Sequence, residues 1–122
     1  MRSHVVECQN FSDKRGDLVV IQDEIPFKIK RSYIIYGKKD IPRGGHSHKK
    51  TIQALVCLEG RVSVSLFDKK LKKEVFVELS TKSDLLILFP EDWHELIFHS
   101  DAILMVLASE PFDPQDYVNE KY

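Results

Sequence analysis

The sequence is poor in cysteine, and its two thiols form no motif. Cys8 and Cys57 stand far apart, with no C-x-x-C spacing, so no disulfide framework is indicated. Cys57 lies inside the apolar run 54–58, where a thiol behaves as a small core residue. We therefore expect both thiols to be reduced. At 122 residues the chain is long enough to be stabilised by a single core.

Surplus charge and long apolar runs are also missing. The 18 Lys and Arg side chains nearly cancel the 19 Asp and Glu side chains, which leaves no net field to attract nucleic acid or an anionic membrane. No apolar run approaches the roughly 18 residues of a membrane span, and residues 1–7 lack the apolar centre of a signal peptide. We expect a cytoplasmic protein with neither nucleic acid nor membrane among its partners.

Helical periodicity is nearly absent, and short β-rich runs take its place. Some runs alternate apolar and polar side chains, typical of half-buried strands, and others are continuously apolar, typical of strands covered on both faces. Gly60 follows one such run, which predicts a hairpin between the runs on either side of it. The predicted strands are 18–21, 27–36, 51–58, 62–66, 75–79, 85–89, 93–98 and 103–108.

The end of the chain is the one exception to this pattern. Asp113 is a residue type that caps helices, and Pro114 suits the first helical position, which predicts a short helix through Tyr117 and Val118. Strands spaced by roughly 8–12 residues, with turn signals between them, favour an antiparallel sandwich or small barrel. We therefore expect an all-β fold with a short C-terminal helix, in which residues 1–122 form a single domain.

The most informative stretch is 42–50, which places His46 and His48 two residues apart after a glycine turn. In a β-strand, side chains at i and i+2 point to the same face, so the two imidazoles should share one space. Imidazole is a common metal ligand, and this spacing lets two rings converge on one ion. Near neutral pH the same rings are suited to general acid and base catalysis. The spacing alone leaves both interpretations open.

Residues 46–48, Gln53 and Gly60 resemble the first motif of the cupin superfamily of small β-barrels, and residues 90–94 loosely resemble the second. The resemblance implies a cupin-type antiparallel β-barrel or jelly roll. Metal-binding cupins carry a glutamate where this chain has Gln53. A neutral amide is a poorer ligand than a carboxylate for a divalent ion, so we expect no metal in the site.

A series of ordered blocks runs along nearly the whole chain around the two histidines. The blocks are 15–18, 25–31, Tyr36, 43–49, 93–95, 106–109 and 116–117. Together they resemble the nucleotide-sugar 3,4-ketoisomerases, the WxcM-like sugar-processing cupins. The resemblance implies conversion of dTDP-4-keto-6-deoxyglucose, or a related dTDP-4-keto-6-deoxyhexose, to its 3-keto isomer. It also implies a homodimer, no metal or organic cofactor, and a role in making sugars for bacterial surface glycans.

The resemblance assigns roles residue by residue. His48 would take the C3 proton, which the 4-keto group acidifies, and His46 would act as a second acid or base. Tyr36 would hold or protonate the sugar oxygens. Arginine binds phosphate through bidentate, charge-assisted hydrogen bonds, so arginines are candidates for the diphosphate. The expected substrate-binding residues are Arg15, Arg31, Tyr33, Arg43, Gln53, Trp93 and His94.

Two alternatives of other classes stand beside this prediction. One is a metal-dependent cupin oxygenase or isomerase, which would use the imidazoles as ligands. The other is a cupin that binds a sugar nucleotide without turning it over.

Overall fold

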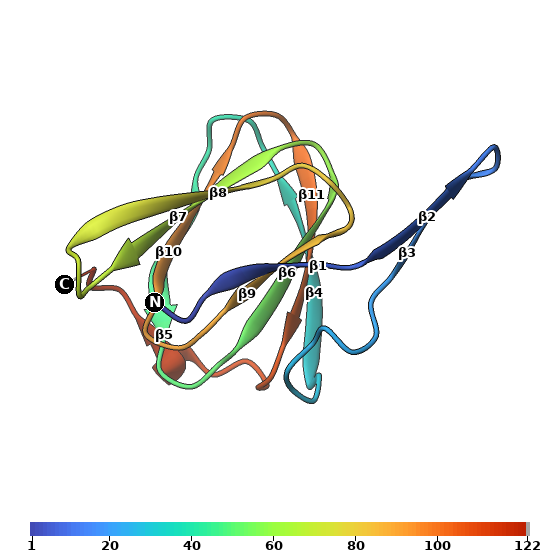
Figure 1. Ribbon diagram of the computed structural model, residues 1–122. Coiled ribbons are helices and arrows are strands. Elements are labelled where there is room, and N and C mark those ends of the chain that lie inside the picture. The colour runs from blue at the N-terminus through green and yellow to red at the C-terminus, as the bar shows by residue number, and fades with distance from the viewer. Residues whose placement is uncertain (122) are drawn as a thin grey trace.

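The computed structural model describes residues 1–121 and confirms an all-β fold (Figure 1). Two five-stranded antiparallel sheets face each other, and a two-stranded hairpin projects away from them. The strands are β1 His4–Glu7, β2 Gln9–Asp13, β3 Gly16–Val20, β4 Arg31–Gly37, β5 Arg43–His48, β6 Gln53–Glu59, β7 Val62–Asp68, β8 Lys73–Leu79, β9 Asp84–Leu88, β10 Trp93–Phe98, β11 Ala102–Ala108 and β12 Tyr117–Val118.

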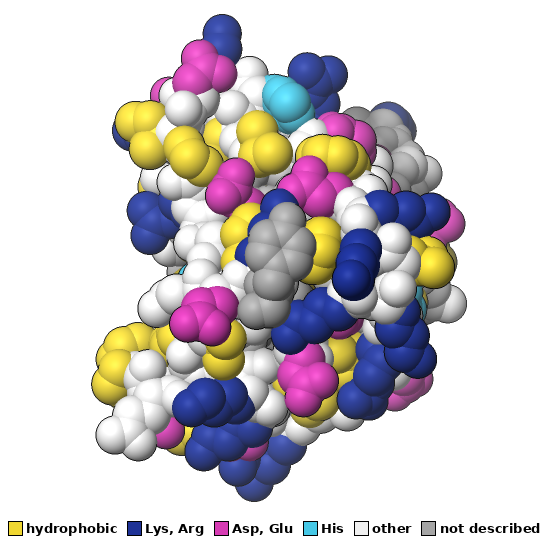
Figure 2. All heavy atoms as spheres, turned by 90° about the vertical axis from the view of Figure 1, so that its left-hand side faces the viewer, with side chains coloured by type: hydrophobic (Ala, Val, Ile, Leu, Met, Phe, Trp, Pro, Cys, Tyr) yellow, Lys and Arg dark blue, Asp and Glu magenta, His cyan; other side chains and the backbone are white. Residues whose placement is uncertain are grey.

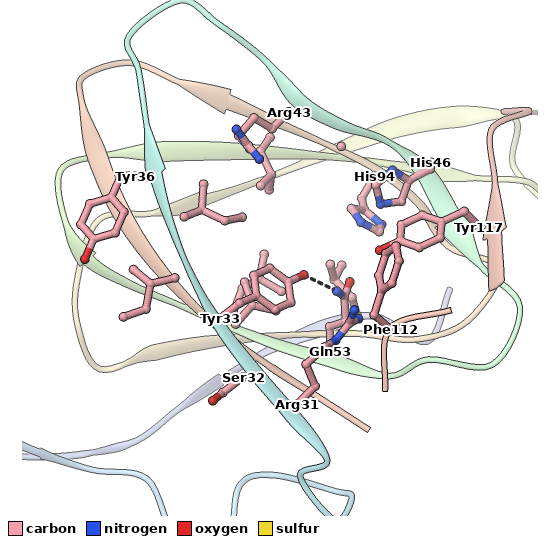
Figure 3. Close-up of a pocket in the computed structure, with 17 residues that line it drawn as sticks. Arg31, Ser32, Tyr33, Tyr36, Arg43, His46, Gln53, His94, Phe112 and Tyr117 are labelled. Atoms are coloured by element: carbon pink, nitrogen blue, oxygen red, sulfur yellow. Dashed lines mark hydrogen bonds between the residues drawn. The ribbon is translucent and has the colours of Figure 1, made fainter. Parts of the chain in front are cut away.

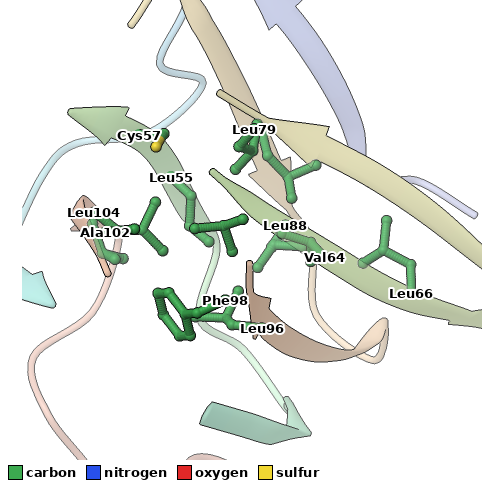
Figure 4. Close-up of a cluster of buried hydrophobic side chains, with 13 residues drawn as sticks. Leu55, Cys57, Val64, Leu66, Leu79, Leu88, Leu96, Phe98, Ala102 and Leu104 are labelled. Carbon is green, nitrogen blue, oxygen red and sulfur yellow. The ribbon is translucent and has the colours of Figure 1, made fainter. Parts of the chain in front are cut away.

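The two sheets enclose the main core. The first sheet has the order β1-β9-β6-β11-β4, and the second has the order β12-β5-β10-β7-β8. Leu55 and Leu104 of the first sheet pack in one cluster with Val64 and Leu96 of the second (Figure 4). These apolar side chains leave water on folding, which is the main source of stability for such a domain.

A second cluster explains why β6 and β9 are apolar at nearly every position. Side chains alternate along a strand, and Ala54 and Val56 of β6 face the outer side of the first sheet together with Ile87 of β9. Partly buried side chains from segment 19–27 pack against this outer cluster. The continuously apolar runs therefore mark strands that are covered on both faces, as predicted.

The predicted hairpin across Gly60 is wrong. Strand β6 pairs with β9 and β11, whereas β7 pairs with β10 and β8, so the turn carries the chain from one sheet to the other. Gly60 has a φ of +86°, and a Cβ there would lie 2.5 Å from the carbonyl oxygen of Asp101. Only glycine fits this close approach. The local pattern marks the turn but not the sheet that the next strand enters.

Strand bounds near the N-terminus also differ from the prediction. Strands β1 and β2 were not predicted, and the polar stretch 11–16 lies in the β2–β3 hairpin. The predicted strand 27–36 begins only at Arg31, as β4. The glycines before His46, which suggested a turn, already belong to a strand, because β5 begins at Arg43. Polar and exposed strands such as β2 lack the apolar alternation on which strand prediction depends.

The predicted C-terminal helix is reduced to one 3-10 turn, η1 Pro114–Asp116. Asp113 caps it as expected, since its side chain accepts a hydrogen bond from the backbone N–H of Gln115. Tyr117 and Val118 leave the helical conformation, and β12 pairs with His48 and Ser47 of β5. This pairing brings the end of the chain against the strand that carries the two histidines.

The surface carries charges of both signs. On the face shown in Figure 2, Lys and Arg side chains lie among Asp, Glu and apolar side chains. In the part of the chain that the structure describes, no helix is long and apolar enough to cross a membrane. The cytoplasmic location and the single-domain organisation expected from the sequence stay predictions.

Candidate active site

A pocket of about 640 Å³ lies between the two sheets (Figure 3). Strand β4 forms one wall, and the rest of the lining comes from β5, β6, β9, β10, β11 and β12 and from Phe112. Its lining mixes imidazoles, tyrosines and arginines with apolar side chains such as Leu55 and Leu96. This combination of an apolar wall with a few convergent polar groups is typical of sites for small molecules.

Three imidazoles meet at one end of the pocket. His46 and His48 share a face of β5, as their spacing predicts, and His94 on β10 is paired directly with His46. The ring centroids lie 5.1 Å apart for His46 and His48, 5.1 Å for His46 and His94, and 5.9 Å for His48 and His94. His46 and His94 line the pocket itself. His48 is buried next to them, with only 3% of its surface exposed.

A buried carboxylate orients His48. Nδ1 of His48 donates to Oδ2 of Asp116 at 3.0 Å, and both side chains are only 3% exposed. The hydroxyl of Thr51 donates to the same oxygen, and the backbone N–H of Lys50 donates to Oδ1 at 2.8 Å. With its proton on Nδ1, the neutral ring carries a lone pair on Nε2. This Nε2 is buried and has no hydrogen-bond partner in the described chain.

The environment keeps the imidazoles neutral and the carboxylate charged. Burial lowers the pKa of His48, and this outweighs the hydrogen bond and negative charge of Asp116, which raise it. Burial and the neighbouring His48 lower the pKa of His46. Burial raises the pKa of Asp116, but hydrogen bonds from Thr51, Lys50 and His48 outweigh it, and the net shift is downward. At neutral pH the site therefore holds unprotonated imidazoles, ready to accept a proton.

A tyrosine and an arginine occupy the wall opposite the histidines. Tyr33 on β4 faces the interior, and its hydroxyl accepts a hydrogen bond from Nε2 of Gln53 at 2.8 Å. Nε of Arg31 is buried without a hydrogen-bond partner in the described chain. The Arg31 guanidinium carbon lies 5.3 Å from the centre of the Tyr33 ring and 5.7 Å from that of Phe112. Arg43 lines the pocket at another point of its wall (Figure 3).

The structure does not bring every predicted residue to the pocket interior. Tyr36 is three positions after Tyr33 on β4, so its side chain points to the opposite side of the strand. It lies at the rim of the pocket, is 69% exposed, and directs its hydroxyl away from the histidines (Figure 3). Trp93 is next to His94 on β10 and therefore faces the other side of the sheet; its ring lies 4.8 Å from Nζ of Lys121. Arg15 is on the projecting hairpin, 85% exposed and paired with Asp13.

Sequence reasoning gave no role to three residues that the fold places at the site. Asp116 forms a hydrogen bond with His48, and Phe112 lines the pocket. The centroid of the Tyr117 ring lies 4.8 Å from that of His46 and 4.6 Å from that of His48. Tyr117 belongs to β12, Asp116 ends the 3-10 turn η1, and Phe112 lies in the loop before that turn. The block 116–117 was the only signal, and nothing in its local pattern shows that it pairs with β5.

The three imidazoles also fit the geometry of a metal site. One ring nitrogen from each of His46, His48 and His94 lies within 4.8 Å of the others. Nδ1 of His94 donates to the backbone carbonyl of Asp92 at 3.1 Å, so its Nε2 is unprotonated, as a ligand requires. Three neutral imidazoles can hold Zn²⁺ or a similar ion and would supply a Lewis acid for a carbonyl oxygen. Gln53 adds no anionic ligand, since its amide is neutral, and the nitrogen of that amide donates to Tyr33.

Comparison with known proteins gives a consistent set of relatives. A family model described as FdtA, WxcM-like, C-terminal matches residues 1–122. The chain is 41% identical to TDP-4-oxo-6-deoxy-alpha-D-glucose-3,4-oxoisomerase of Aneurinibacillus thermoaerophilus over 124 residues, which is 98% of this chain and 88% of the relative.

Two solved structures of QdtA, a sugar 3,4-ketoisomerase of Thermoanaerobacterium thermosaccharolyticum, are also similar. The complex of that enzyme with TDP gives a TM-score of 0.88 at 38% identity, over 97% of this chain and 88% of that chain. A mutant of that enzyme in complex with TDP-4-keto-6-deoxyglucose gives a TM-score of 0.89 at 38% identity, over 97% of this chain and 87% of that chain. These likenesses confirm the cupin-type antiparallel fold.

The burial of His94 predicts a pH dependence of stability. The pKa of His94 is lowered from 6.5 to about 3, and burial is the largest cause. Between these two pH values the unfolded chain binds the proton more readily than the folded chain. The contribution of His94 to the free energy of unfolding is therefore fully present above about pH 6.5 and declines as pH falls towards 3. The slope from this group is at most about 1.4 kcal/mol per pH unit. Urea unfolding between pH 7 and pH 4 should show this decline, and His94→Gln should make it less steep.

His4→Gln is the matched control, because His4 is exposed. It should leave the pH dependence unchanged. An equal slope in His94→Gln and in the unmodified protein would contradict the assignment of the slope to His94.

Proposed function

This chain belongs to the FdtA, WxcM-like family, and we propose that it is a nucleotide-sugar 3,4-ketoisomerase that acts on a TDP-linked 4-keto-6-deoxyhexose. The observation that carries the proposal is the buried pair of His48 and Asp116 beside His46, at the end of a pocket with arginines on its wall. The relatives named as 3,4-ketoisomerases, with TDP and TDP-4-keto-6-deoxyglucose bound, support the substrate class.

The proposed reaction moves a carbonyl group between neighbouring carbons by proton transfer alone. His48 takes the proton from C3, and the electrons of that bond form the C3–C4 double bond of an enediolate whose charge lies on the C4 oxygen. The proton of the C3 hydroxyl passes to the C4 oxygen. C4 accepts a proton that has exchanged with solvent as the imidazolium of His48 returns to its neutral form, which leaves the carbonyl at C3. No net oxidation occurs. Asp116 stabilises the imidazolium that forms on His48, and His46 is placed to exchange protons with the two oxygens.

We assign the diphosphate to the arginines of the pocket wall. Among the described residues, Nε of Arg31 is buried without a hydrogen-bond partner, and an unsatisfied buried guanidinium nitrogen is costly unless a ligand completes it. Arg43 on β5 adds a second cation on the side of the pocket that faces β4. Guanidinium groups bind phosphate oxygens through two parallel hydrogen bonds. The roles predicted from the sequence for Tyr36 and Trp93 stay predictions, since neither side chain faces the histidines.

Turnover of TDP-4-keto-6-deoxyglucose tests the proposed function. The protein should convert it to the 3-keto isomer, and His48→Asn should lower kcat at least about 100-fold while TDP still binds, because removing a general base costs this much. His99→Asn, a change outside the pocket, should keep full activity. No product from the unmodified protein, with TDP bound normally, would leave the non-catalytic binding protein as the better account.

A metal-dependent isomerase or oxygenase is the second candidate, and the convergence of three imidazoles is the observation that favours it. The same assay separates the two. Metal-free protein prepared with a chelator should retain full activity if His48 acts as a base. Activity that requires stoichiometric bound metal would instead support the second candidate.

Asp116→Asn should change both the rate and its pH dependence. Asp116 raises the pKa of His48 against the larger effect of burial, which lowers it. Loss of the charge therefore lowers the pKa of His48 further, and the acid limb of the kcat/KM profile should move to lower pH. The plateau of kcat should fall roughly 100-fold or more, since the imidazolium loses its partner. Asp113→Asn, which keeps the cap of η1, should leave the profile unchanged; a profile equally unchanged in Asp116→Asn would contradict the assigned role.

We also propose that the protein is a homodimer in which a second copy covers the β2–β3 hairpin. The hairpin projects from the body (Figure 1), with Phe11 55% and Leu18 62% exposed. An isolated two-stranded hairpin is at best marginally stable in water, so a covering surface would stabilise it. Strand β4 at the edge of the first sheet offers one, with Ile34 50% exposed and free backbone groups on its outer side. Arg15 at the hairpin tip would then lie on the partner, which is compatible with its predicted phosphate role.

Sedimentation analysis tests the dimer. The unmodified protein should sediment at twice its chain mass, and the double variant Phe11→Asp/Leu18→Asp should sediment as a monomer, because buried carboxylates in an apolar interface are costly. Phe76→Asp is the control, since Phe76 is also exposed, at 59%, but lies on β8 of the second sheet. A monomeric unmodified protein, or a dimer that persists in the double variant, would contradict the proposal.

A further inference from the structure

One hydrogen bond inside the pocket has a defined polarity. Gln53 of β6 is 4% exposed, and its Nε2 lies 2.8 Å from the hydroxyl oxygen of Tyr33 on β4 (Figure 3). An amide nitrogen can only donate, so in this bond the tyrosine hydroxyl accepts. Its single proton is left for another partner.

The charged side chains around Tyr33 cannot accept its hydroxyl proton, so the hydroxyl can donate a hydrogen bond into the pocket. The charged neighbours of Tyr33 include Arg31, whose guanidinium carbon lies 5.3 Å from the ring centre, and Arg43. Guanidinium groups have no lone pair to accept a hydrogen bond. Burial, the largest effect, raises the pKa of Tyr33, so the hydroxyl keeps its proton throughout the neutral range. Both residues line the pocket.

We propose that Gln53 is a positioning residue that turns the Tyr33 hydroxyl into a hydrogen-bond donor to the substrate oxygen that becomes negatively charged. The inference rests on the proposed function, in which that oxygen is the C4 oxygen of the enediolate. A donor already aimed at the developing charge stabilises the transition state without reorganisation. Tyr33 is then the group that touches substrate, and Gln53 acts through it.

A neutral residue at position 53 is required for this role. An ionised glutamate there would accept a hydrogen bond from Tyr33, because a carboxylate has no proton to donate. The hydroxyl would point away from the substrate and its proton would be lost to the reaction. The amide sets the opposite polarity with almost the same shape.

A double-mutant cycle in the isomerase assay tests this role. Gln53→Glu and Tyr33→Phe should each lower kcat about 100-fold with little change in KM, the size expected for one oxyanion donor. The double variant should be no slower than Tyr33→Phe alone, because the two residues act as a unit. Gln53→Met, which is neutral and cannot donate, should fall between Gln53→Glu and the unmodified protein. Gln22→Glu, at an exposed glutamine, is the matched control and should be fully active.

TDP affinity, measured by calorimetry, is the check on folding and separates the outcomes. An unmodified protein that binds TDP but gives no product would overturn the proposed function itself. With an active unmodified protein, a Gln53→Glu variant of normal kcat, or losses that multiply in the double variant, would overturn only the role of Gln53. Loss of TDP binding in both Gln53→Glu and Gln53→Met would assign Gln53 a structural role instead.

Discussion

The buried hydrogen bond between Asp116 and His48 is the constraint on which the site depends. It joins residues 68 positions apart in sequence, and the same carboxylate takes up the Thr51 hydroxyl and the Lys50 backbone. A buried carboxylate is tolerated only when such partners satisfy it. The 3-10 turn that ends at Asp116 and the pairing of β12 with β5 serve to hold it there. The orientation of the base, the position of Tyr117 and the closure of the pocket all follow from this contact.

The pocket combines neutral bases with permanent cations. Burial keeps the three imidazoles unprotonated at one end, while Arg31 on β4 and Arg43 on β5 supply positive charge from two sides of the pocket. A base that is neutral before it accepts a proton, and cations that stay charged throughout, suit a substrate that carries a diphosphate at one end and an acidic C–H bond at the other. The amide at Gln53 extends this pattern, because it directs a hydrogen bond without adding charge. The same neutral imidazoles are what a metal would use, which is why metal content has to be measured.

The sequence predicted the all-β fold, the shared face of His46 and His48, and the family, because these depend on local alternation and on ordered motifs. Contacts between strands that are distant in the sequence could not be predicted from local patterns. The sheet that β7 joins is decided by packing across Gly60, and the role of Asp116 is decided by a strand pairing that no local pattern encodes. The choice between Tyr33 and Tyr36 depends on which side of β4 faces the pocket, because the two positions have opposite parity. Residues 33–36 are apolar or aromatic at every position, so their pattern does not show which side this is.

The central claim is that proton transfer at C3 and C4 is the whole of the chemistry. Nuclear magnetic resonance of TDP-4-keto-6-deoxyglucose incubated with metal-free protein in deuterated water tests it most directly. We predict a 3-keto product that carries deuterium at C4, together with exchange at C3 of the remaining substrate, and neither signal with His48→Asn. A 3-keto product that forms without solvent label at C4, or that forms only after metal is restored, would contradict the account.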